Sequence, residues 1–249
     1  MAESIKLWAD SYPVHSYEVD SKSRAKIVSI INYFQESAWR NAESLGIGFH
    51  DLATKNLFWV LSRLYVEIYE YPLWGQNISL ETWAKGIDNM FALRDFRLKS
   101  NDSEKLLGAG TSAWLIIDGK TQRLQRIEQT FSHIKCNTQN AIEHKFTKIT
   151  LAPTMTSQAR TIAGYSDLDV NNHVNNVSYL NWAVNYFPVE SPVLNIRSAE
   201  LNFLSEARLR SPIEILYGKL CEKIWICSLR NPETEKEYCR IKLKIETEK

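Results

Sequence analysis

Two segments of the chain place apolar residues at the spacing of an amphipathic helix. In each segment they recur at intervals of three or four residues, which puts them on one helical face. The first set is Ile27, Ile30, Ile31, Phe34 and Ala38, and the second is Val174, Val177, Leu180, Val184 and Phe187. Gly46 and Gly48 follow the first pattern and Pro188 ends the second, and both residue types stop helices. We therefore predict one long helix in each half of the chain.

Segments with the pattern of β-strands follow each predicted helix, in the same order in both halves. The corresponding pairs are Ile78–Trp83 with Ile213–Tyr217, Phe91–Lys99 with Lys223–Arg230, and Gly108–Asp118 with Tyr238–Glu246. In the last segment, Ile241, Leu243 and Ile245 alternate with charged residues, which is typical of an antiparallel sheet with one buried face. The predicted fold class is α+β, with each helix wrapped by an antiparallel sheet.

The two halves also repeat each other in sequence. Residues 28–33, VSIINY, resemble residues 177–182, VSYLNW, at an offset of 149 positions (177 − 28). A polar turn separates the last two strands of each half, Asn101–Lys105 in the first and Asn231–Lys236 in the second. Chance similarity between two amphipathic helices is the alternative, but the shared order of elements and turns favours duplication. We predict an N-terminal domain of residues 1–127, a polar linker of residues 128–150 and a C-terminal domain of residues 151–249.

Composition supports packed domains and narrows the class of partner. The chain has 249 residues, 44% hydrophobic and 24% charged, and its 8 Trp, 11 Tyr and 9 Phe argue against disorder. The formal net charge of +1 provides no global attraction to nucleic acid or anionic lipid, so an acidic partner needs a local basic patch. No segment has the pattern of a signal peptide or the ~20 apolar residues of a membrane-spanning helix. The sequence predicts a soluble, cytoplasmic protein.

Polar side chains are concentrated in Asp167–Trp182, directly before the second predicted helix. This segment holds five asparagines, two aspartates and one histidine. A calcium loop is excluded because Asn172 and Ser178 stand where the loop needs glycine and glutamate. A zinc site is excluded because His173 has no further histidine or cysteine at metal-ligand spacing. Helix capping accounts for one or two of these residues; the rest indicate a site that orients protons, with no metal or cofactor.

The polar cluster is present in only one of the two repeats. At the offset of 149 positions, the aligned pairs are Asp169 with Asp20, Asn171 with Lys22, and His173 with Arg24. The first copy thus keeps the helix and loses the cluster around the histidine. A duplicated domain with chemistry in only one copy is expected to have this pattern.

The motif of residues 167–176, DLDVNNHVNN, followed by Tyr179 and Trp182, resembles the active-site signature of plant and bacterial acyl-ACP thioesterases. Further segments are similar to patterns of the family: Phe58–Leu64, Arg94–Phe96, Thr111–Trp114 and Glu200–Ala207. The resemblance covers nearly the whole chain and implies two tandem hotdog domains. It also implies hydrolysis of fatty acyl-ACP, with the acyl carrier protein as partner, an acyl-chain pocket in the N-terminal domain and the chemistry in the C-terminal one.

The resemblance assigns catalytic roles to Asp169, Asn171, His173 and Glu206. His173 suits a general base or proton relay, because histidine titrates near neutral pH. Glu206 suits a group that orients or activates water, and Asp169 suits one that fixes the positions of Asn171 and His173. The first N–H groups of a helix starting near Val174 are expected to polarise the thioester carbonyl.

One position departs from many plant members of this family, which carry a cysteine directly after the glutamate. This chain has Ala207 there, and its four cysteines show no CxxC spacing, so we expect direct attack by water. We expect no plastid-targeting extension of the kind that plant members carry, which makes the bacterial type the closer comparison. Two other functions stay open, namely a hotdog 3-hydroxyacyl dehydratase or hydratase and a non-catalytic acyl-carrier-binding module. Assembly as a homodimer stays open as well.

Overall fold

The computed structural model describes residues 7–127, 132–188 and 193–246. The chain divides into two compact units, Met1–Lys145 and Phe146–Lys249. The boundary between the units falls inside the segment predicted as a linker. Among the described residues, no helix is long and apolar enough to cross a membrane.

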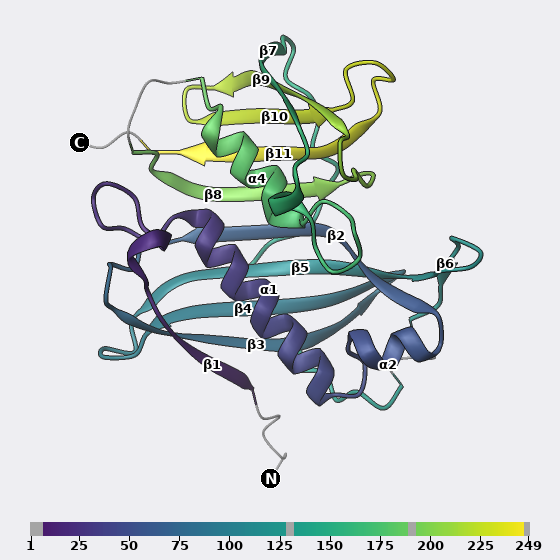
Figure 1. The fold of residues 1–249 in the computed structure, drawn as a ribbon. Helices are drawn as coiled ribbons and strands as arrows, with labels where there is room; N and C mark the ends of the chain where they lie inside the picture. The colour runs from purple at the N-terminus through teal and green to yellow at the C-terminus, as the bar shows by residue number, and fades with distance from the viewer. Residues whose placement is uncertain (1–6, 128–131, 189–192, 247–249) are drawn as a thin grey trace. The chain divides into compact units, whose positions relative to one another are not determined.

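The first unit consists of one long helix packed against an antiparallel sheet. Its elements are β1 (Trp8–Pro13), a short 3-10 turn (Ser16–Glu18), α1 (Ile27–Ser44), α2 (Phe49–Thr54), β2 (Leu57–Ile68), β3 (Asn77–Asp88), β4 (Phe91–Ser100), β5 (Leu106–Asp118) and β6 (Leu124–Gln125). The strand order is β1-β3-β4-β5-β2, and β6 pairs with β5. Helix α1 lies across one face of this sheet (Figure 1).

The packing of α1 explains its apolar stripe. Ile30, Ile31 and Phe34 are at most 2% exposed, and the Phe34 ring stacks on Phe96 of β4 with ring centroids 4.6 Å apart. Gly110 of β5 makes room for this contact, because a Cβ atom there would lie 2.6 Å from the Phe34 ring. The helical pattern in the sequence therefore marks the face that covers the sheet.

The second unit repeats this architecture with shorter elements. They are β7 (Thr156–Ile162), a 3-10 turn (Tyr165–Asp167), α4 (Asn176–Asn185), β8 (Ile196–Phe203), β9 (Pro212–Cys221), β10 (Ile224–Arg230) and β11 (Glu237–Ile245). The strand order β7-β9-β10-β11-β8 matches that of the first unit position by position. A helix wrapped by an antiparallel sheet is the hotdog fold, so the prediction of an α+β protein with tandem hotdog domains is confirmed.

Three features of the fold differ from the sequence-based expectation or were missed. Helix α4 begins at Asn176 and ends at Asn185, two residues inside the apolar pattern at either end. The strands β1 and β7, which precede the two helices, lie at the edges of their sheets. In β1, partly buried side chains alternate with exposed ones, and in β7 most side chains are exposed. Neither strand nor the short helix α2 has a hydrophobic pattern strong enough to predict it.

The described part of the predicted linker is tied to the units rather than surrounded by solvent. In the first unit, the N–H of Asn137 donates to the carbonyl of Ala84 in β3 (2.9 Å). In the second, the N–H of Ile149 donates to Asn202 Oδ1 (3.1 Å), and its carbonyl accepts from Arg240 Nη1 (2.6 Å). These hydrogen bonds hold the linker backbone at Asn137 and at Ile149.

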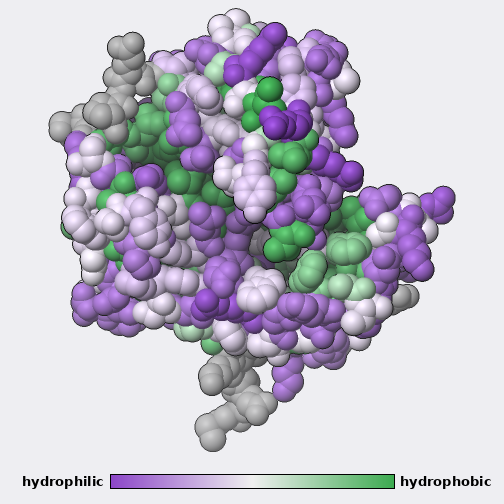
Figure 2. Space-filling model, viewed as in Figure 1, coloured by the Kyte–Doolittle hydropathy of each residue, from purple (hydrophilic) through white to green (hydrophobic). Residues whose placement is uncertain are grey.

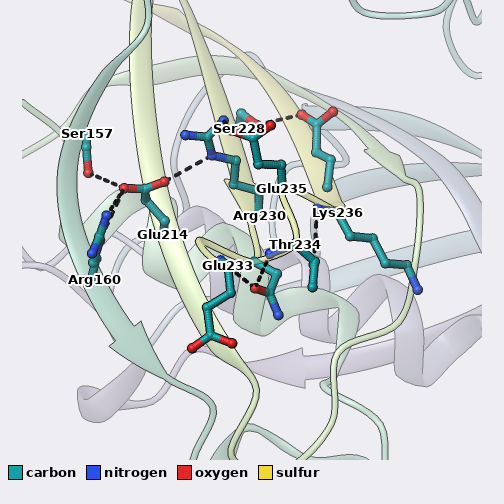
Figure 3. Close-up of polar contacts among 11 residues, drawn as sticks. Ser157, Arg160, Glu214, Ser228, Arg230, Glu233, Thr234, Glu235 and Lys236 are labelled. Carbon is teal, nitrogen blue, oxygen red and sulfur yellow. Dashed lines mark hydrogen bonds and ion pairs between the residues drawn. The ribbon is translucent and has the colours of Figure 1, made fainter.

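A buried carboxylate joins three strands of the second sheet. Glu214 of β9 is 4% exposed and accepts hydrogen bonds from Ser157 and Arg160 of β7 and from Arg230 of β10 (Figure 3). Burial works against ionisation, but the hydrogen bonds from the two arginines and the serine outweigh it, so that the pKa of Glu214 lies below its ordinary value. The charge network thereby fastens the edge strand β7 to the rest of the sheet.

Candidate active site

The polar loop before α4 is shaped by one carboxylate. Asp169 Oδ1 accepts the backbone N–H groups of Asn171 (2.8 Å) and His173 (3.2 Å), and the N–H of Asp169 donates to the carbonyl of His173 (2.8 Å). Asn172, at the tip, has a φ of 59°, a left-handed conformation that asparagine tolerates better than most residues. Asp169 therefore closes a tight turn that presents the His173 side chain.

His173 meets Glu206 across two segments that are distant in sequence. His173 Nε2 lies 3.3 Å from Glu206 Oε2, and the two side chains are 29% and 48% exposed. Glu206 follows the end of β8, and its segment is held by a hydrogen bond from the Val174 N–H to the Ala207 carbonyl (2.9 Å). The pair is consequently half-exposed, anchored by backbone on both sides and within reach of a bound molecule.

Tyr179 of α4 contacts the residue that follows Glu206. Its hydroxyl accepts the backbone N–H of Ala207 (3.1 Å), and the residue is 3% exposed. Burial raises the pKa of the Tyr179 phenol above its ordinary value, so the side chain stays neutral at physiological pH. The sequence motif includes this tyrosine, but only the structure reveals the contact next to Glu206.

The side chain of Asn171 is not joined to the His173–Glu206 pair. In the described part of the chain its amide forms no hydrogen bond with protein, and the residue is exposed. The side chains of His173 and Glu206 are thus in direct contact, and Asp169 contacts the backbone of His173. The Asn171 amide is available to a ligand.

The start of the helix does not offer the free N–H groups that the sequence predicted. The N–H of Val177 donates to the side chain of Asn175, the N-cap residue (2.9 Å). The N–H groups of Val174, Asn175 and Ser178 donate to the carbonyls of Ala207, Asp167 and Asn175, respectively. The expectation is therefore wrong for these four residues, because the loop and the cap already satisfy their N–H groups.

The first unit contains the same loop with different side chains. Asp20 Oδ1 accepts the N–H groups of Lys22 (2.8 Å) and Arg24 (3.1 Å), and Ser23 has a φ of 60°. At the position of the histidine, Arg24 donates from Nε to Asp20 Oδ2 (3.1 Å) and lies over the ring of Tyr71, 5.4 Å from its centroid. The loop is duplicated, but the imidazole is replaced by a guanidinium.

The position of Glu206 is also changed in the first unit. There the N–H of Ala25 donates to the carbonyl of Pro72 (2.8 Å), as that of Val174 does to Ala207 in the second unit. Tyr71 precedes Pro72 just as Glu206 precedes Ala207. An Arg–Tyr contact thus stands where the second unit has a His–Glu pair, and an arginine cannot act as a base near neutral pH.

The cysteines do not form a reactive centre. Cys227 and Cys239 are fully buried in β10 and β11, and burial raises the pKa of both thiols. Burial also raises the pKa of Cys136 in the first unit, while Cys221 is exposed at the end of β9. Among the described residues, no three His, Cys, Asp or Glu side chains converge as they would around a metal ion.

A duplicated hotdog fold with a polar pair in only one copy defines the structural class, and sequence comparison defines the family. The chain belongs to the acyl-ACP thioesterase family. The model of its N-terminal domain matches residues 6–134, and the model of its C-terminal domain matches residues 153–249.

Plant relatives are about 30% identical to this chain over the aligned residues. The chloroplastic oleoyl-acyl carrier protein thioesterase 1 of Arabidopsis thaliana is 30% identical over 200 residues, which cover 74% of this chain and 55% of the relative. The chloroplastic palmitoyl-acyl carrier protein thioesterase of Gossypium hirsutum is 30% identical over 212 residues, covering 80% and 50%. The chain spans about half the length of these relatives.

Solved structures match the chain over nearly its full length. An acyl-ACP thioesterase from Bacteroides thetaiotaomicron superimposes with a TM-score of 0.86 at 25% identity, covering 96% of this chain and 98% of that one. The 12:0-ACP thioesterase from Umbellularia californica gives a TM-score of 0.84 at 23% identity, with coverages of 97% and 98%. The second likeness concerns the fold alone.

Proposed function

We propose that this protein hydrolyses the thioester of fatty acyl-ACP and releases a free fatty acid and holo-ACP. The observation that carries the proposal is the His173–Glu206 pair at 3.3 Å, present in one of two otherwise equivalent loops. Membership of the acyl-ACP thioesterase family and the names of the plant relatives support the substrate class. The proposed site residues are Asp169, Asn171, His173 and Glu206.

In the proposed mechanism, a water molecule bound against His173 and Glu206 attacks the thioester carbonyl carbon. The pair accepts a proton from this water as the new C–O bond forms, which is general-base catalysis. The C–S bond then breaks, and the thiolate leaves with the electron pair. A thiol of pKa about 8.5–10 is a competent leaving group, and the proton held by the pair completes the free thiol. No second nucleophile is needed.

Asp169 and Asn171 have supporting roles in this proposal. Asp169 fixes the turn by accepting the N–H groups of Asn171 and His173, so it acts as a positioning residue. The exposed Asn171 amide donates to the carbonyl oxygen, where negative charge develops in the transition state. This side chain replaces the helix N–H groups, which already have acceptors.

The two halves of the chain have different roles in this proposal. Residues 151–249 carry the chemistry, residues 1–127 form the pocket for the acyl chain, and residues 128–150 join them. The Arg24–Tyr71 contact supports a non-catalytic role for the first unit, because it stands at the position of the catalytic pair and supplies no base. A cytoplasmic location and assembly as a homodimer stay predictions.

The carrier protein docks, in this proposal, on the turn after Glu206. Arg208, Leu209 and Arg210 are exposed there. The backbone of Arg208 forms an isolated antiparallel β-bridge with that of His173. Exposed apolar residues do not by themselves identify the docking surface. Figure 2 shows apolar residues at several places among hydrophilic ones on one face of the molecule. Two cations beside the catalytic pair, in contrast, suit an acidic carrier that delivers its thioester to that point.

A product assay tests the proposed function. The purified protein is incubated with acyl-ACP and, separately, with 3-hydroxyacyl-ACP. Release of free ACP thiol and fatty acid from acyl-ACP supports the hydrolase. Formation of enoyl-ACP without thiol release identifies a dehydratase instead, and binding of acyl-ACP without turnover identifies a non-catalytic binding module.

A further inference from the structure

The second unit contains a pocket beside the C-terminal end of α4. Its volume is about 400 Å³, which lies within the range of roughly 300–1,000 Å³ that is typical of small-molecule sites. Its lining includes Thr156 of β7, Tyr217 and Lys219 of β9, Trp225 of β10, and Pro188, which follows α4. The function proposed above uses none of these residues.

The pocket forms where β7 and β9 separate. Strand β7 begins at Thr156, which pairs with Tyr217, whereas β9 continues to Cys221. The segment before β7 passes close to β9 at Gly218, where a Cβ atom would lie 2.3 Å from the carbonyl oxygen of Thr154. Glycine at this position therefore keeps the segment against the strand and holds Thr154 at the rim of the pocket.

Aromatic rings form the floor of the pocket. Trp225 pairs with Lys219, and Tyr217 is two residues before Lys219, so these three side chains point to the same face of the sheet. The Tyr217 and Trp225 ring centroids lie 6.3 Å apart, and both rings contact Phe187 edge-on, at 5.4 and 5.2 Å. The Tyr217 hydroxyl donates to the carbonyl of Ala183 in α4 (2.5 Å). Tyr217 therefore offers its ring, and not its hydroxyl, to a ligand.

One cation faces this floor. Lys219 is exposed, and its Nζ lies 5.4 Å from the centroid of the Trp225 ring. Within the described ranges of the chain, no carboxylate lies at ion-pair distance from Lys219, and the pocket lining includes no acidic residue. The lining side chains of Thr154, Thr156 and Gln158 are exposed and form no hydrogen bond with the described part of the protein. The pocket thus combines apolar walls, one positive charge and neutral hydrogen-bonding groups.

We propose that this pocket binds a small apolar carboxylate, with the carboxylate group at Lys219 and the apolar part on the rings of Tyr217 and Trp225. A carboxylate suits the pocket better than a phosphate, because phosphate sites usually combine arginine forks or several backbone N–H groups. The inference does not rest on the function proposed above. His173 precedes α4 and Pro188 follows it, so a helix of 10 residues, about 15 Å long, separates this pocket from the catalytic pair.

The test titrates the wild type with octanoate and with 1-octanol, which has the same chain without the charge. The readout is the NMR resonance of the Trp225 indole N–H, assigned as the one that is lost in Trp225→Phe. Octanoate should shift this resonance to saturation, with a Kd about fivefold below that of 1-octanol at low salt. The difference should shrink at high salt. A resonance that does not move, or equal Kd values at low salt, overturns the inference.

Lys219→Met tests the role of the cation, and Lys223→Met is its matched control. Lys223 is exposed between β9 and β10 and is not part of the pocket lining. Lys219→Met should raise the Kd of octanoate to that of 1-octanol, and Lys223→Met should leave both values unchanged. Equal losses of octanoate affinity in the two variants attribute the effect to net charge and overturn the inference.

Thr156→Phe tests the location, because a ring at this exposed position fills the pocket. Octanoate should no longer shift the Trp225 resonance in this variant, and a shift of wild-type size overturns the inference. If the protein hydrolyses acyl-ACP, octanoate bound as a product elsewhere should still be detected by calorimetry in Thr156→Phe. A protein that binds octanoate at Trp225 but hydrolyses nothing loses the proposed function and keeps this site. The wild-type comparison of octanoate with 1-octanol decides the inference if a variant does not fold.

Discussion

At the scale of single residues, the site depends on contacts that fix where two side chains meet. Glu206 is half-exposed and follows a strand end, a place where backbone is usually mobile. Its position is set by hydrogen bonds to the neighbouring Ala207, from the Val174 N–H to its carbonyl and from its own N–H to Tyr179. The distance between His173 and Glu206 thus depends on the contacts of Val174 and Tyr179 with Ala207.

Replacing Tyr179 with phenylalanine tests this control. Tyr179→Phe leaves the buried N–H of Ala207 without its acceptor, which costs about 1–3 kcal/mol of stability. The Glu206 segment should then move, and kcat should fall by about tenfold or more while KM changes little. Steady-state kinetics and thermal melts at one pH measure both effects. A loss of stability with unchanged kcat would restrict Tyr179 to a structural role.

A second prediction at this scale concerns the nucleophile. Residue 207, directly after Glu206, is an alanine, and burial raises the pKa of Cys227 and Cys239, so none of these positions supplies a thiolate. Thiol alkylation should leave most of the activity. Rapid acid quench during turnover, followed by intact-mass measurement, should find no acyl group on cysteine or serine. An acyl adduct mapped to either residue type would replace direct water attack with covalent catalysis.

At the scale of elements, the second unit relies on charge where its edge strand meets the sheet. The lowered pKa of Glu214 means that its ionised form stabilises the fold. That stability is fully present above the unfolded-state pKa of Glu214, near the ordinary value of 4.5, and is lost as the pH falls through the folded-state pKa. The carboxylate therefore favours folding at neutral pH and not in acid.

Glu214→Gln should lower the free energy of unfolding by about 1–3 kcal/mol at pH 7, the range for hydrogen bonds to charged groups. The difference from the wild type should shrink as the pH falls below about 4.5. Denaturant melts across this pH range measure it, with the exposed Glu233→Gln on the neighbouring turn as control. A difference that is constant with pH would mean that shape, and not charge, holds β7.

The turn after Glu206 gives a prediction about docking. Arg208→Glu with Arg210→Glu should lower kcat/KM for acyl-ACP by about tenfold or more at low salt, and less at high salt, because screening weakens charge attraction. Hydrolysis of a small acyl thioester without the carrier should change little. Lys22→Glu, on the corresponding loop of the first unit, is the matched control. Equal losses on both substrates would mean that the arginines act on the chemistry and not on the carrier.

Element order could be predicted from the sequence because the helices and inner strands bury one face, and burial leaves a periodic pattern. Ile30 and Phe34 reveal α1 in this way. The edge strands β1 and β7 could not be predicted, since one or both faces meet water. The motif of residues 167–176 indicated His173, and the resemblance of Glu200–Ala207 to the family indicated Glu206. A pattern along the chain carries no information on the roles of Asn175 and Tyr179, which depend on a helix cap and a long-range contact.

At the scale of the whole molecule, duplication explains both the symmetry of the fold and the asymmetry of the site. The two loops share the same turn, a left-handed residue at the same position (Ser23 and Asn172) and an aspartate that accepts the same two backbone N–H groups. They differ where chemistry requires a base, with Arg24 and Tyr71 in one copy and His173 and Glu206 in the other. In the proposed function, one copy binds the acyl chain and the other hydrolyses the thioester.

The most direct test compares release of fatty acid from acyl-ACP by the wild type, His173→Ala and Arg24→Ala under identical conditions. His173→Ala should lower kcat by about 10²–10⁴-fold, the usual contribution of a general base, with little change in Tm because the side chain is partly exposed. Arg24→Ala should keep kcat within about threefold, although its loss of the Asp20 ion pair should lower the Tm. Equal losses of kcat in the two variants, or full activity in His173→Ala, would contradict the assignment of catalysis to the second unit.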